Sequence, residues 1–128
     1  MARTELLLAG AIALAACAST PPPPPLPFDV RPTMTGLRVD TLAIARGLEA
    51  ANQDGVVSNA RRLESIVIVP PGADAGAEFD SLAAGFTSAA RLLRGSLESD
   101  DLPRARIAFS QLLQRCDACH ARFRAPAR

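Results

Sequence analysis

The sequence has no tryptophan, no tyrosine and no lysine, and aromatic residues make up only 4% of its 128 residues. A core must therefore be built mainly from Ala, Leu, Ile and Val, which suits helices and would gain from a large, flat, apolar cofactor. The formal net charge of +1 gives no argument for nucleic-acid binding. The length and the hydrophobic content of 48% indicate one small globular domain.

The first 16 residues predict a signal peptide. A single arginine precedes an apolar run, Leu6 to Ala16, which is well short of the ~20 residues that cross a membrane. Residues 14–17, Leu-Ala-Ala-Cys, resemble a bacterial lipobox and imply cleavage before Cys17 and a lipid on its sulfur. The alternative is an ordinary signal peptide cleaved near Ala18. The absence of Asp at position 18 implies sorting to the outer membrane, so we expect a periplasmic, lipid-anchored protein.

Residues 17–31 form the expected connection between the anchor and the domain. Five consecutive prolines, Pro21 to Pro25, fix φ and lack backbone N–H donors, so the stretch is predicted to be extended polyproline II. At ~3.1 Å per residue, Pro21 to Pro27 spans about 20 Å, which would hold a domain away from a membrane surface. A proline-rich docking motif is the alternative.

From residue 32 onward the hydrophobic spacing is helical. It predicts a first helix from about Arg31, a third helix after a loop that ends near Gly76, and a fourth that starts at Asp101 or Leu102, before Pro103. The stripes are Met34, Leu37, Thr41, Ile44, Leu48 and Ala51; Phe79, Leu82, Phe86, Ala89, Leu93 and Leu97; and Ile107 or Phe109, Leu112, Leu113, Cys116, Cys119, His120 and Phe123. Pro126 is expected to end the fourth helix.

The second helix is the least distinct of the four. Its stripe is Val56, Ala60, Leu63 and Val67, and Pro70-Pro71-Gly72 ends it. Ile66 to Val69 alone also fits a strand, but nothing nearby could pair with it. Four helices of roughly 14 to 24 residues with short connections predict an all-α, up-down-up-down four-helix bundle over residues 32–128.

The segment Cys116-Asp117-Ala118-Cys119-His120 is the attachment pattern of c-type haem. On a helix, positions i, i+3 and i+4 share a face, so both thiols can reach one edge of a porphyrin and bond its two vinyl groups. His120 lies one turn beyond Cys116, where its imidazole can reach the iron. The sequence therefore predicts one covalent haem c per chain.

Three other interpretations of this pattern fit less well. A thioredoxin-like redox pair needs a βαβ setting, which the sequence lacks. A structural zinc site needs four nitrogen or sulfur ligands; because His120 is the only histidine and Cys17 is assigned to lipid, it would need a second chain. A Cys116–Cys119 disulfide suits an oxidising compartment but leaves His120 unexplained.

The segment from Arg115 to Arg124 resembles the C-terminal signature of the cytochrome c′ family, C-x-A-C-H-x-x-[FY]-R, on the last helix of a four-helix bundle. The resemblance covers about residues 31–128 and is carried mainly by the motif. It implies that His120 is the proximal iron ligand and that Phe123 and Arg124 pack beside the proximal haem face. Arg124 is explained equally well as a cation near a helix C-terminus.

The sequence departs from this family in two places. The loop between the second and third helices, Pro70 to Ala77, is expected to be shorter than usual, which would leave the haem more open to water. Phe79 lies near the place where many members have a tryptophan.

Met34 is the only ordinary strong sixth ligand left in the mature chain. It lies in the first turn of the first helix, at about the height of His120 in an antiparallel bundle, and the family's distal residue comes from the same stripe. Core packing explains Met34 equally well. Arg31 and Arg38 flank it, either facing haem propionates or lying on a solvated helix face.

Three functions remain open at this point. They are an electron-transfer cytochrome with His120 and Met34 as ligands, a five-coordinate cytochrome c′ that binds NO or CO, and a haem-free structural lipoprotein. The expected partners are a redox protein or a diatomic gas, and a membrane through Cys17. The lack of a second histidine and of paired carboxylates on a predicted pocket wall argues against an enzyme. Ile66 to Val69 supplies an apolar face through which the chain could form a homodimer.

Overall fold

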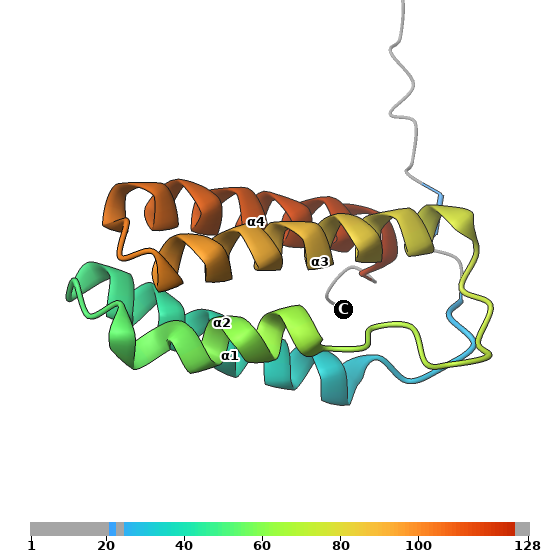
Figure 1. Cartoon of the computed structure of the whole chain (residues 1–128). Coiled ribbons are helices and arrows are strands. Elements are labelled where there is room, and N and C mark those ends of the chain that lie inside the picture. Colours follow the sequence, from blue (N-terminus) through green and yellow to red (C-terminus); the bar gives the residue numbers. More distant parts are fainter. Residues whose placement is uncertain (1–20, 23–24, 125–128) are drawn as a thin grey trace, which may run out of the picture.

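In a computed structural model, residues 21–22 and 25–124 of the chain are described. Within this range the regular secondary structure is helical, without a strand, and the helices alternate in direction along the chain (Figure 1). The elements are α1 (Arg31–Glu49), the short 3-10 helix η1 (Asp54–Val56), α2 (Val57–Ser65), α3 (Ala77–Glu98) and α4 (Leu102–Phe123). The prediction of an all-α chain with four helices is therefore confirmed.

Several predictions concern residues outside these described ranges. They are the signal peptide Met1 to Ala16, the lipidated Cys17, the spacer prolines Pro23 and Pro24, and Pro126 as the end of the last helix. Among the helices that the structure describes, none has both the length and the hydropathy of a membrane span.

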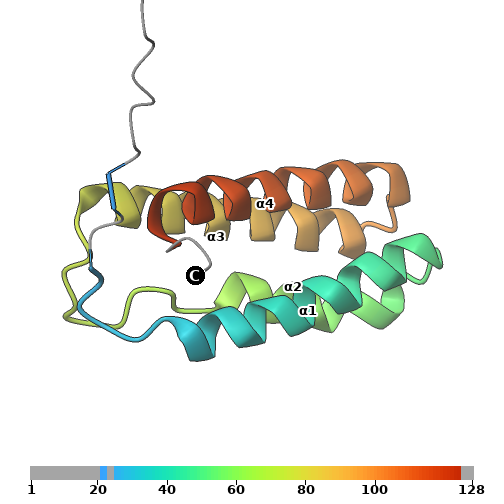
Figure 2. The ribbon, with the colours of Figure 1, turned by 180° about the vertical axis from the view of Figure 1, so that it is seen from behind.

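The four helices form two layers, α1 with α2 and α3 with α4 (Figures 1 and 2). The contact of α3 with α4 is the most extensive, and α2 packs on α3, whereas α1 meets α4 over a short stretch. At the joined end, where α1 and α3 end, Arg106 Nη2 donates to the Leu48 carbonyl at 3.0 Å and ties α4 to α1. At the splayed end, where α1 and α3 begin, the layers lie farther apart (Figure 2).

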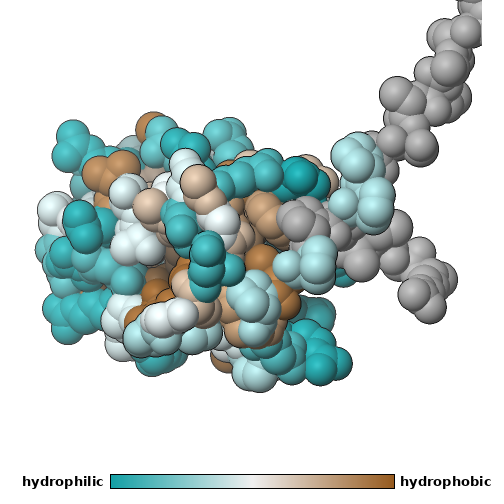
Figure 3. All heavy atoms as spheres, turned by 90° about the vertical axis from the view of Figure 1, so that its right-hand side faces the viewer, coloured by the Kyte–Doolittle hydropathy of each residue, from teal (hydrophilic) through white to brown (hydrophobic). Residues whose placement is uncertain are grey.

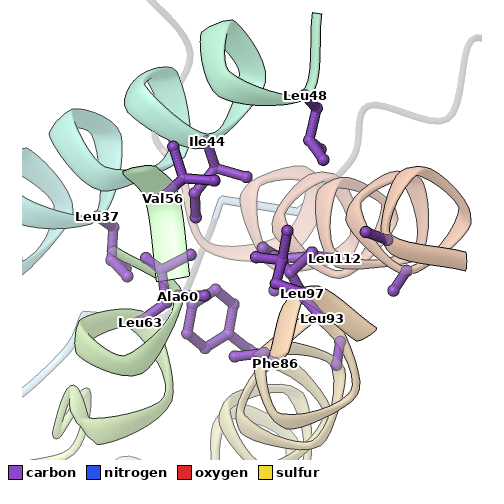
Figure 4. Packing of buried hydrophobic residues seen from close by; sticks show 14 residues of the cluster. Leu37, Ile44, Leu48, Val56, Ala60, Leu63, Phe86, Leu93, Leu97 and Leu112 are labelled. Atoms are coloured by element: carbon purple, nitrogen blue, oxygen red, sulfur yellow. The ribbon is translucent and has the colours of Figure 1, made fainter. Parts of the chain in front are cut away.

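Apolar side chains from all four helices fill the space between the layers (Figure 4). Burying a Leu, Ile or Phe side chain contributes about 1.5–3 kcal/mol, so these positions decide which helix faces turn inward. Leu37, Ile44, Phe86, Leu93 and Leu112 are all buried and confirm stripes of three predicted helices. In the fourth stripe, Phe109, the alternative to Ile107, packs against the core. Leu113 is exposed, so its predicted place on that stripe is wrong.

Local sequence explains where the long helices begin and end. The Asp101 carboxylate accepts the backbone N–H of Arg104 at 3.0 Å, and Pro103 occupies the first turn, as the sequence predicts for α4. Two residues after the last residue of α1 and of α3 the backbone has positive φ, 53° at Ala51 and 57° at Asp100. This left-handed backbone turns the chain and lets later N–H groups reach the last carbonyls of the helix.

The second helix is shorter than predicted. It has nine residues, and Ile66 after it is extended, with φ −65° and ψ 129°. Ile66 and Ile68 pack against the core while Val67 is 64% exposed, which is the alternation of an extended chain. β-branched side chains and Pro70, which disfavours helical backbone in the residue before it, explain the early end. The stripe through Val67 is therefore wrong, and the connection to α3 is longer than expected.

Gly47 marks a close approach between α1 and η1. A methyl group on Gly47 would lie 2.3 Å from Val56 Cγ1, whereas one on Gly36, in the same helix, would have nothing within 4 Å. We expect Gly47→Ala to lower stability by about 1–3 kcal/mol through overpacking. Gly36→Ala should raise it by about 0.5–1 kcal/mol, because Ala favours helix. Urea unfolding followed by circular dichroism measures both, and equal effects would contradict the tight contact.

Candidate functional site

The last two turns of α4 carry Cys116, Cys119 and His120. The backbone is helical through this stretch, so the three positions share one side of the helix as predicted. Both cysteines are half-buried, and Cys116 packs against the core. His120 is exposed, so its predicted place on the core stripe is wrong. At 3.6 residues per turn, His120 lies about 80° around the helix from the buried Leu112.

Met34 lies in the opposite layer, in the first turn of α1. Its backbone N–H donates to the Val30 carbonyl at 2.9 Å, which forms part of that turn. The Met34 side chain is half-buried and packs against the same apolar core as Cys116. Ile66 and Ile68, from the connection between α2 and α3, pack against this core as well. Met34 and Cys116 thus border one apolar core from the two layers.

Three phenylalanine rings join the splayed end to the segment before α1. Phe79, in the first turn of α3, is 2% exposed. Its ring meets those of Phe28 and Phe123 edge to face, with centroids 5.9 and 5.0 Å away. Arg122 Nε donates to Glu78 at 3.0 Å beside them. The last turn of α4, which follows His120, is therefore fixed against the start of α3.

Figure 3 looks directly at this splayed end. Hydrophobic side chains are visible in the middle part of this face, and hydrophilic ones surround them. The apolar core therefore continues up to the surface on the side where α4 ends and α1 begins.

The three arginines near the predicted site are all exposed: Arg31, Arg38 and Arg124. Arg31 donates Nε and Nη2 to the Asp29 carboxylate, each at 2.9 Å, and this pairing raises the pKa of Arg31. The backbone N–H of Arg124 donates to the His120 carbonyl at 3.1 Å and continues the last turn of α4. The solvated-face interpretation of Arg31 and Arg38 fits this exposure.

A buried carboxylate holds α1 against α2. Asp40 is 6% exposed and accepts hydrogen bonds from Arg62 Nη2 at 2.5 Å and Asn59 Nδ2 at 2.8 Å. A buried charge needs such partners, and the Asp40 carboxylate raises the pKa of Arg62 in return. Asp40 lies on the Met34 helix, so this pair positions Met34. The sequence analysis missed it, although an acidic residue between Leu37 and Ile44 was the available signal.

The electrostatic setting of the two thiols differs from that of a redox-active pair. Burial raises the pKa of both Cys116 and Cys119, and the Asp117 carboxylate raises that of Cys116 further. The thiols also lie near the C-terminal, negative end of the α4 dipole. A reactive thiol needs the opposite, a pKa lowered by cations or a helix N-terminus. Both thiols are unbridged, and nowhere in residues 21–22 and 25–124 do three metal-ligating side chains gather.

Two surface grooves lie between α3 and α4, with volumes of about 490 and 460 Å³. They share Leu92 and Gln111 in their linings. The second also includes Arg115, next to Cys116, but none of the predicted haem-binding residues lines either groove.

Comparisons with protein-family models, curated proteins and solved structures find no match for the chain. The candidate site is therefore defined by this chain alone. It comprises Cys116, Cys119 and His120 on α4 and Met34 on α1, with Phe123 and Arg124 adjoining it.

Asp117 gives a selective test of the thiol electrostatics. Asp117→Asn removes a negative charge beside Cys116, so the pKa of Cys116 should fall while that of Cys119, raised by burial alone, stays unchanged. In the haem-free chain, alkylation at fixed pH should therefore accelerate at Cys116 only, because the thiolate is the reacting form. Mass spectrometry of the peptides measures both rates. Asp117→Glu keeps the charge and is the control; equal acceleration at both cysteines contradicts the assignment.

Proposed function

We propose that the chain is a c-type cytochrome that carries one covalent haem on Cys116, Cys119 and His120 and transfers electrons. One observation carries this proposal: Cys-x-x-Cys-His lies on a continuous helix, with Cys116 against an apolar core that Met34 borders from the other layer. The all-helical fold, with the motif on its last helix, agrees with the architecture that the resemblance to cytochrome c′ implies.

The residues at the splayed end fit a haem. Two thiols and an imidazole on one helix are the donor set that covalent haem attachment requires. The thiols are half-buried, so they adjoin apolar side chains without being enclosed by them. Their raised pKa separates them from a redox-active thiol pair, in which the pKa is lowered.

Each side chain has a separate task in this proposal. Cys116 and Cys119 would hold the haem through two thioether bonds, one to each vinyl group. His120 would offer the iron an imidazole nitrogen, and Met34 would offer a thioether sulfur from α1. Bound haem supplies a one-electron couple, whose potential His and Met ligands raise. The Asp40–Arg62 pair positions α1 and with it Met34.

Phe123 and Arg124 are proposed to lie beside the proximal haem face. Phe123 is suited to this because Phe79 already fixes its ring at the splayed end. Haem c is attached outside the bacterial cytoplasm, in agreement with a periplasmic protein held by a lipid on Cys17. The outer membrane is the proposed location of that anchor.

A second candidate function is binding of NO or CO by a five-coordinate cytochrome c′. It is favoured by the packing of Met34 against the core, since a bulky apolar distal residue would pack in the same way. The two functions differ in whether Met34 binds the iron.

The optical spectrum of the chain, produced with the haem maturation machinery, tests the proposal. We expect a low-spin spectrum with the Met-to-iron charge-transfer band. Met34→Ala should abolish this band and give a high-spin spectrum, while Leu42→Ala, an exposed position on the same helix, should leave it intact. A high-spin wild type that binds carbon monoxide on reduction would support the gas-binding function. A colourless protein would contradict haem binding altogether.

A further inference from the structure

The chain enters the fold at the end that carries the candidate site. Phe28, in the connection before α1, is half-buried against Phe79, and Phe79 in turn contacts Phe123, three residues after His120. The backbone N–H of Arg31 then donates to Asp29 Oδ1 at 3.0 Å as α1 begins. The residues directly before α1 are therefore fixed to the splayed end.

We propose that the splayed end faces the membrane that holds Cys17, and that the partner of the site is a membrane-bound redox protein. This inference rests on the proposed lipid anchor and haem site. From Cys17 to Phe28 the chain advances 28 − 17 = 11 residues, which span at most about 40 Å when fully extended. The joined end lies about one helix length from the splayed end, because the 22 residues of α4 extend about 33 Å.

The length of the connection limits which proteins can reach the site. His120 and Met34 lie near the attachment point, so they remain within the layer that the connection spans above the membrane. A partner held in the same membrane reaches this layer without diffusing from the bulk. A soluble carrier would meet the joined end first, and the candidate haem ligands do not lie there.

The tether, rather than surface charge, sets this orientation. The described charges of the splayed end nearly balance, and two ion pairs, Asp29–Arg31 and Glu78–Arg122, neutralise part of them. The acids are Asp29, Asp74, Glu78 and Asp80, and the bases are Arg31, Arg122 and Arg124. An end without surplus cations is not drawn to anionic lipid, so the orientation should form on neutral lipid and persist in salt.

Two serines allow the orientation to be measured. Ser81 and Ser99 are exposed at opposite ends of α3 and are 99 − 81 = 18 residues apart, or about 27 Å along the helix axis. Ser81→Cys and Ser99→Cys are made separately in the full-length, haem-loaded chain and labelled with a thiol-reactive fluorophore. Each protein is then incorporated into phosphatidylcholine vesicles that carry an acceptor dye on their headgroups.

We expect the acceptor dye on the headgroups to quench the label at Ser81 at least two-fold more than the label at Ser99, at both low and high salt. Phe28→Ala should bring this ratio toward one, because the ring contact with Phe79 is lost. Pro27→Ala, at the exposed neighbouring position, is the matched control and should preserve the ratio. Equal quenching in the wild-type background overturns the orientation, and a ratio that salt abolishes overturns the tether as its cause.

Two further measurements test the lipid anchor and the haem attachment separately from the orientation. A chain that does not float with the vesicles overturns the lipid anchor and with it this inference. Mass spectrometry should find one label per chain, because Cys116 and Cys119 are bonded to haem; three labels would overturn haem attachment. In that case Cys116 and Cys119 are both replaced by serine, so that each protein again carries a single label. The ratio of quenching at Ser81 to quenching at Ser99 then decides the orientation.

Discussion

Close packing of α3 against α4 is the constraint on which the rest of the structure depends. Buried alanines on both helices, Ala89 and Ala90 on α3 and Ala108 on α4, let the backbones approach, and this pair has the most extensive contact of the fold. Small side chains at a helix crossing favour axis distances near the lower end of the usual range of about 8–10 Å. At the splayed end, contact between Phe79 and Phe123 continues the same interface. The helix with the Cys-x-x-Cys-His motif is therefore supported along its length by one neighbour.

The hydrogen bond from Arg106 to Leu48 sets the spacing between α1 and α4 directly at the joined end. Toward the splayed end this spacing is also set indirectly, through α2 and α3. Glu64 links α2 to α3 by accepting hydrogen bonds from Arg94 and Arg91, which together hold the pKa of its carboxyl below the usual range. Asp40 links α1 to α2 through Arg62. These two polar contacts thus contribute to the separation of Met34 from the motif helix. Such buried or shared charge pairs fix relative position more than they add stability.

Local patterns in the sequence predicted more than long-range contacts did. The start of α4 was readable because Asp101 and the proline after it act on their own neighbours. The motif was readable for the same reason, since its spacing is contained in two helical turns. The end of α2 was not, because the run Ile66–Val69 fits helix and strand alike and its packing on the core decides between them. The burial of Asp40 and the contact of Phe28 with α3 join segments far apart in sequence, which periodicity does not address.

The candidate site lies at the border of the core rather than inside it. The side chains that stabilise the fold are therefore not the ones proposed to hold the haem. Ile44 and Leu112 are fully buried, and replacing such side chains with Ala costs about 2–5 kcal/mol. Met34 and the two cysteines of the motif are half-buried, so an apolar cofactor placed among them would extend the core instead of replacing part of it. The few aromatic residues are also divided between the core and the site at its border. Of five phenylalanines in the chain, Phe79 and the two that contact it, Phe28 and Phe123, lie at the splayed end, where a flat apolar ring system would adjoin them.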